Sequence, residues 1–144
     1  MHNKALTDNH YLQRTQREQA LEEVAAQSAK TATWLRQLIE REDRLSQEGN
    51  GYGELYSQRQ FGLAVAPIVQ REVTRARVLA TTRARGLTLT EIAEKLAIPP
   101  PEVMPHVVAL RRRGQLVMEK VEDEVTPVYR APEQPEQAEE AEVS

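Results

Sequence analysis

Residues from about 9 to about 47 contain no glycine and no proline. This stretch is rich in Ala, Leu, Glu, Gln and Arg, which are strong helix formers. Asp8 is a suitable N-cap residue in front of it, and glycines at positions 49, 51 and 53 supply the stop. These features predict one long helix, which we assign to an N-terminal segment spanning residues 1–50.

Eight residues of this helix are spaced at alternating steps of three and four, as in a coiled-coil heptad, although Ser28, Thr31 and Glu42 among them are polar. Two or three heptads are marginally stable alone, so the stripe needs a surface to pack on. That surface can be the chain's own domain, or the stripe can form a coiled coil with a second copy or another partner. We expect its leucines and valine to make that contact, namely Leu21, Val24, Leu35 and Leu38. The full stripe contains Leu21, Val24, Ser28, Thr31, Leu35, Leu38, Glu42 and Leu45.

The remaining chain divides into three parts. Residues 51–67 form a connector that contains Tyr52, Tyr56 and Phe61, and aromatic residues in a linker suggest docking. Pro67 suits the first turn of a helix, so we expect a folded domain over residues 68–131. Residues 132–144 are acidic and nearly free of bulky apolar residues, which predicts a disordered tail.

Within 68–131 the sequence predicts three helices and a hairpin. The first helix covers 68–85 and stops at Gly86. A capping box from Thr88 to Glu91 opens a short helix that Pro99 ends. The third helix covers about 101–113, has Val103, Val107 and Leu110 on one apolar face, and stops at Gly114. Two extended segments follow, 115–121 and 125–130, joined by a polar tip at 122–124.

This order of elements, together with the segments LTLTEIAEKLAI (87–98) and VVALRRRGQLV (107–117), resembles the winged helix-turn-helix superfamily. The resemblance covers residues 68–131 and leaves the N-terminal helix and the tail outside. It implies a mostly α fold: a long N-terminal helix followed by a winged helix-turn-helix domain with a small β-hairpin wing. Function does not follow from this fold, because it serves both DNA readers and protein-interaction modules.

The third helix is poorly suited to reading DNA bases. Winged helices that read DNA place polar side chains at the start of this helix, because base edges need donors and acceptors. Here the stretch 100–106 is PPEVMPH, in which only Glu102 and His106 can hydrogen-bond through a side chain. The predicted wing tip is Glu-Asp-Glu, the wrong sign for gripping phosphate. Met104, Pro105 and Val108 instead form an apolar face that suggests a protein partner.

A second function stays open, that of a dimeric DNA-binding transcriptional regulator in which the long helix is the dimerisation arm. Residues 73–131 contain 10 Lys and Arg against 7 Asp and Glu, so the domain is mildly basic and nucleic acid is a possible partner. At the end of the third helix, arginines also complement the helix dipole. The candidate phosphate contacts are Arg83, Arg85, Arg111, Arg112, Arg113 and Lys120.

The sequence carries no catalytic or cofactor motif that we recognise. There is no cysteine, and the three histidines are scattered without a second ligand at metal-binding spacing. We therefore expect a non-enzymatic protein with no catalytic residue, no metal and no cofactor. We find no signal peptide and no run of about 18 apolar residues, so we expect a cytoplasmic protein without a membrane contact. The primary prediction is a protein-interaction module, accessory subunit or regulator of a larger complex.

Overall fold

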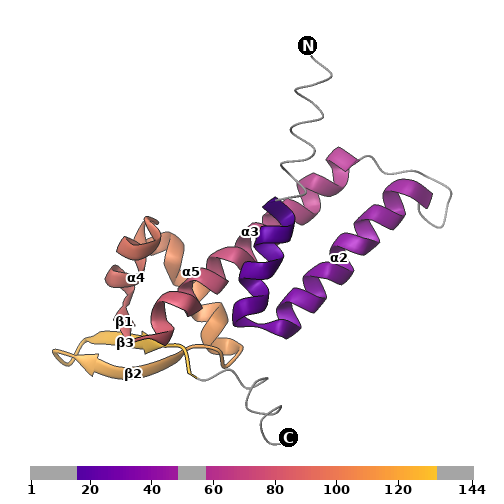
Figure 1. Cartoon of the computed structure of the whole chain (residues 1–144). Coiled ribbons are helices and arrows are strands. Elements are labelled where there is room, and N and C mark those ends of the chain that lie inside the picture. Colours follow the sequence, from indigo (N-terminus) through magenta and orange to yellow (C-terminus); the bar gives the residue numbers. More distant parts are fainter. Residues whose placement is uncertain (1–15, 49–57, 133–144) are drawn as a thin grey trace, which may run out of the picture. The chain divides into compact units, whose positions relative to one another are not determined.

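A computed structural model of the chain describes residues 16–48 and 58–132 (Figure 1). The chain divides into two compact units, Met1–Val73 and Thr74–Ser144. Helices make up most of the described residues, and a small three-stranded sheet lies in the second unit. The predicted mostly α fold is therefore confirmed. The predicted N-cap Asp8, the predicted helix stop at glycines 49, 51 and 53, and the predicted tail from residue 133 onward lie outside the described residues.

The single long N-terminal helix is the first point at which the prediction is wrong. Residues 16–27 are helical, the helix is interrupted at Ser28, and α2 then spans Ala29–Glu48. The Ser28 side chain caps α2, because its Oγ accepts a hydrogen bond from the Thr31 backbone N–H at 3.3 Å. Serine competes with the backbone for hydrogen bonds in this way, so a helix can end here without glycine or proline.

The two helical segments fold back on each other as a hairpin (Figure 1). Arg17 near the start of the first segment pairs with Glu42 of α2 at 3.1 Å, although 25 residues separate them. Glu42 is buried and its second oxygen, Oε2, has no hydrogen-bond partner. This ion pair matters because removing one partner of a buried pair leaves an uncompensated charge.

Helix α3 spans Gln58–Arg83 and corrects the predicted boundary at residue 67. Pro67 lies inside α3 rather than in its first turn, so the segment predicted as a connector is helical from Gln58. A proline inside a helix removes one backbone hydrogen bond. Val65 and Val69 on either side of it are buried, and burial of this kind stabilises helices more than propensity does.

The second unit has the winged helix-turn-helix arrangement that the sequence predicts. After α3 come strand β1 (Leu87–Thr88), helix α4 (Leu89–Leu96) and helix α5 (Pro100–Arg112). Strands β2 (Val117–Glu122) and β3 (Thr126–Arg130) form the wing. The sheet is antiparallel with the order β1-β3-β2. The predictions did not include β1, since two residues are too few for a sequence pattern.

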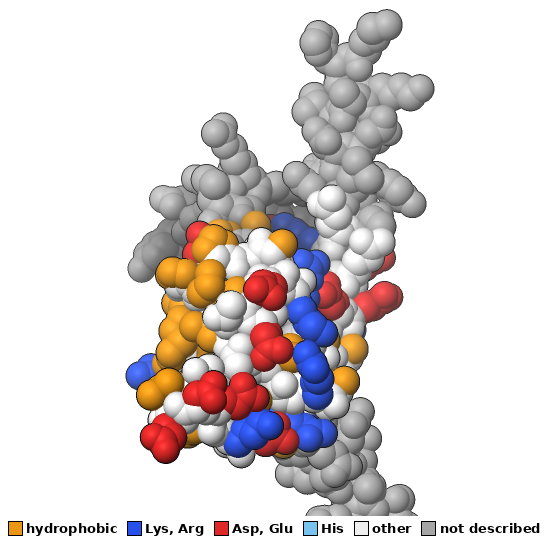
Figure 2. Space-filling view, turned by 90° about the vertical axis from the view of Figure 1, so that its left-hand side faces the viewer, with side chains coloured by type: hydrophobic (Ala, Val, Ile, Leu, Met, Phe, Trp, Pro, Cys, Tyr) orange, Lys and Arg blue, Asp and Glu red, His pale blue; other side chains and the backbone are white. Residues whose placement is uncertain are grey.

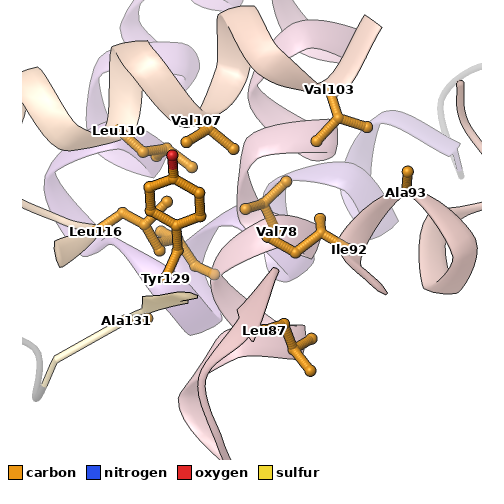
Figure 3. Close-up of a cluster of buried hydrophobic side chains, with 11 residues drawn as sticks. Val78, Leu87, Ile92, Ala93, Val103, Val107, Leu110, Leu116, Tyr129 and Ala131 are labelled. Carbon is orange, nitrogen blue, oxygen red and sulfur yellow. The ribbon is translucent and has the colours of Figure 1, made fainter. Parts of the chain in front are cut away.

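The core of this unit lies between α3, α4, α5 and the sheet (Figure 3). Val103, Val107 and Leu110 of α5 are spaced four and three residues apart, and each is at most 1% exposed. The predicted inner face of the third helix is therefore confirmed. The other members of the core are Val78, Leu79, Leu87, Ile92, Ala93, Leu116, Tyr129 and Ala131.

The turn between α4 and α5 forces an alanine into a left-handed conformation. Helix α4 ends at Leu96, before the three prolines, and Ala97 has φ 54° and ψ 43°. The N–H of Ile98 bonds to the carbonyl of Ala93 at 3.1 Å, and that of Ala97 bonds to Glu94 at 3.3 Å. These two bonds form a Schellman motif, which glycine fits best because it has no Cβ.

We expect Ala97→Gly to raise the free energy of unfolding by about 1 kcal/mol, because the left-handed region disfavours residues with a Cβ. Urea unfolding of the two chains measures this difference. Ala109→Gly is the matched control, since Ala109 lies inside α5; there the same change should cost about 1 kcal/mol. Equal destabilisation by both substitutions would contradict the left-handed turn.

The predicted capping box at the start of α4 is present. The Glu91 N–H bonds to Thr88 Oγ1 at 3.2 Å, and Glu91 Oε1 accepts from the Thr88 N–H at 3.0 Å. Hydrogen bonds from the Thr88 backbone, then from its side chain, hold the pKa of Glu91 below its ordinary value of 4.5, with smaller help from Arg85 and Lys95.

This lowered pKa predicts a pH dependence. A carboxylate with a lowered folded pKa contributes stability above its unfolded pKa, and this contribution is lost as the pH falls through the folded pKa. We therefore expect Glu91→Gln to be less stable than the wild type at about pH 6, with the gap closing toward about pH 3. Urea unfolding across that range measures the gap, and a constant gap would contradict a role for the Glu91 charge.

Candidate interaction surface

The outward face of α5 is apolar over its first two turns. Because Val103, Val107 and Leu110 point into the core, the opposite side of α5 faces outward. Met104 is 40% exposed and Val108 is 36% exposed, one turn apart on the same side of the helix. Pro101 and Pro105 are exposed beside them. We call Pro101, Met104, Pro105 and Val108 the α5 face.

The α5 face offers almost no hydrogen-bonding group for a base edge. Of the two polar residues in this part of α5, Glu102 is exposed and acidic. His106 is half-buried, and its Nδ1 accepts a hydrogen bond from Arg75 Nε at 3.3 Å. His106, the one polar residue of this stretch that is not acidic, therefore already interacts with α3. This contact weakens the case for a helix that reads DNA bases.

The wing carries a second exposed apolar group that the sequence did not single out. Every residue of β2 is exposed, and Val125 at the tip is 78% exposed. Sequence alternation could not show this, because a bulge between Met118 and Lys120 breaks the alternation of faces. The exposed apolar residues of the wing are Val117, Met118, Val121 and Val125.

Acidic residues occupy the wing tip, as predicted. Asp123 and Glu124 form the turn with φ values of 50° and 65°, and the Val125 N–H bonds to the Glu122 carbonyl at 3.1 Å. Figure 2 shows hydrophobic side chains gathered along one side of this face of the molecule, with acidic side chains at their lower end. Such a tip repels phosphate rather than gripping it.

The structure separates the candidate phosphate contacts into three groups. Arg83 Nη1 donates to the Pro132 carbonyl at 2.6 Å. Arg85 pairs with Glu91 at 3.3 Å, and Lys120 pairs with Glu122 at 3.8 Å. The third group lies at the C-terminal end of α5 and is exposed; it comprises Arg111, Arg112 and Arg113.

Of the residues predicted to contact a partner through the N-terminal helix, two are already buried within the chain. Val24 is 2% exposed and Leu35 is 0% exposed, and Leu21 and Leu38 are half-buried. The described residues of the stripe are therefore buried or half-buried in a single chain. The alternative of packing on the chain's own residues accounts for this burial without a second copy.

Comparisons with known proteins identify one domain, which lies in the second unit of the chain. Residues 74–119 match the family model described as a helix-turn-helix domain. With the wing formed by β2 and β3, this part of the chain is a winged helix-turn-helix domain. Comparisons with curated proteins and with solved structures found no match. A helix-turn-helix domain fits a regulatory or DNA-binding role and is typically non-enzymatic.

Within residues 16–48 and 58–132, no helix is both long enough and apolar enough to cross a membrane. In the same residues, no three His, Cys, Asp or Glu side chains lie together as metal ligands would.

Proposed function

We propose that the chain is a regulator or accessory subunit whose winged helix-turn-helix domain binds a protein partner through the α5 face. The observation that carries the proposal is the exposure of Met104 and Val108 at the position where DNA-reading domains present polar side chains. Side chains that favour burial remain exposed there, so a partner that covers them gains the hydrophobic free energy.

The chemistry of the surface describes the partner. The α5 face continues into Arg111 and Arg112, one turn beyond Val108. A matching surface presents an apolar ridge with a carboxylate at one end, where it meets an arginine fork. The cytoplasm is the proposed location, and homodimerisation through residues 16–48 is a separate proposal that depends on the hairpin opening.

An aspartate in the α5 face tests the proposal. We expect Met104→Asp and Val108→Asp to abolish partner capture by the full chain while its unfolding stays cooperative, because a carboxylate would have to be desolvated without a partner group. Thr90→Asp, which adds the same charge at an exposed site on α4, is the control. The readout is the set of proteins that the wild type and Thr90→Asp retain and both face variants lose. An empty set would contradict the proposal.

DNA binding is the second candidate, favoured by the family match and by the exposed Arg111 and Arg112. A titration against random duplex DNA at low and moderate salt tests it. Steep salt dependence that falls when Arg111, Arg112 and Arg113 are replaced by alanine would establish phosphate contacts and favour the regulator. Absence of binding at low salt would remove this candidate.

A further inference from the structure

The C-terminal end of α5 is a concentrated positive surface. Arg111, Arg112 and Arg113 are all exposed, and no ion pair joins Arg111 or Arg112 to another residue within 16–48 and 58–132. The Arg111 guanidinium lies 6.0 Å from the centre of the Tyr129 ring. We call these three residues the arginine end of the domain. Adjacent like charges of this kind attract anionic groups.

The last described residues, 129–132, lead from the arginine end to α3. Tyr129, under Arg111, is three residues before Pro132. The Ala131 N–H bonds to the Thr82 carbonyl at 3.3 Å, and Arg83 holds the Pro132 carbonyl at 2.6 Å. Two contacts to α3 therefore fix the point from which residues 133–144 start.

Residues 133–144 complement this surface in charge. They contain five glutamates and no lysine or arginine, in the sequence EQPEQAEEAEVS. Twelve residues span at most about 40 Å, and Tyr129, already in contact with Arg111, lies at most about 10 Å of chain from Pro132. The glutamates can therefore reach the arginine end without any change in the folded domain.

We propose that residues 133–144 dock on the arginine end and compete there with other polyanions. Because the segment is tethered to the domain, its effective concentration at the arginine end is in the millimolar range. Glutamate–arginine pairs that are individually weak when exposed therefore form without a second molecule. The contact is electrostatic and spread over several groups, so it weakens as salt screens it. In the full chain the arginine end is then shielded from nucleic-acid phosphates.

Nuclear magnetic resonance of three chains tests the docking: the full chain, a chain ending at Pro132, and a full-length chain with its glutamates at 133, 136, 139, 140 and 142 replaced by glutamine. At low salt we expect the backbone and Nε–H signals of Arg111, Arg112 and Arg113 to shift in both altered chains relative to the full chain. At about 1 M salt, where the Debye length is about 3 Å, the full chain should give the signals of the truncated one. Cooperative urea unfolding of each chain confirms that the domain stays folded.

Identical arginine signals in the full and truncated chains at low salt would overturn the proposal. Full-chain signals retained in the glutamine chain would also overturn it, because the contact would then not be electrostatic. The shielding has its own measurement: at low salt the truncated chain should bind random duplex DNA about tenfold more tightly than the full chain. Equal affinity would overturn the shielding role.

Discussion

Leu110→Ala should lower the free energy of unfolding of the winged domain by about 3 kcal/mol, within the range of about 2–5 kcal/mol for buried leucines. Leu110 is 1% exposed and lies in the core that α5 forms with α3, α4 and the sheet. Deleting its branched end loses the transfer free energy of the removed atoms and leaves a cavity that the packed neighbours fill only in part.

Val108→Ala is the matched control for this prediction. Val108 lies on the same helix two residues earlier but faces outward with 36% of its surface exposed. Its truncation should change the free energy of unfolding by less than about 1 kcal/mol. Urea unfolding followed by far-ultraviolet circular dichroism measures both variants. Comparable losses from the two would mean that α5 is not oriented as described, and the α5 face would lose its basis.

Gly86→Ala should destabilise the same domain by about 1–3 kcal/mol, the usual cost of overpacking. A Cβ added at Gly86 would lie 2.7 Å from Val128 Cγ1 and would overlap the Glu119 carboxylate. The carboxylate is the end of a flexible, exposed side chain and can move. Val128 is 2% exposed in β3 and cannot, so the strand itself must shift.

A comparison with Gly114 separates steric cost from conformational cost. Gly114 ends α5 with φ +74°, and nothing lies within 4 Å of an added Cβ. Asparagine tolerates this left-handed position, so Gly114→Asn should cost less than about 1 kcal/mol. Gly86→Asn should cost at least as much as Gly86→Ala. Urea midpoints of the four chains measure the differences, and equal costs at the two glycines would contradict the close approach of β3 to Gly86.

Much of the winged domain was predictable because its signals are local. A capping box needs only Thr88 and Glu91 three residues apart, and α5 was placed to within about one residue by its apolar spacing and by Gly114. An outward apolar face at Met104, Pro105 and Val108 could be predicted in the same way, because these residues lie opposite the inner face of the helix. The exposed state of Met104 and Val108 agrees with that inference.

The errors fall where distant residues decide the outcome. The heptad stripe was equally compatible with one long helix and with a hairpin, because the same residues face inward in both. The Ser28 cap and the Arg17–Glu42 pair, 25 residues apart in sequence, decide for the hairpin. Pro67 suited a helix start by its own preference, but α3 continues through it.

The sequence by itself determined which residues are capped, which faces of the helices are apolar and where charge accumulates, because these properties depend on neighbours within one or two turns. Tertiary structure decided which of those faces stay exposed. It buried Val24 and Leu35 of the N-terminal stripe in a hairpin, engaged His106 with Arg75, placed Tyr129 under Arg111 and bound the Pro132 carbonyl to Arg83. Burial and pairing are properties of chain segments that meet in space, so no local pattern specifies them.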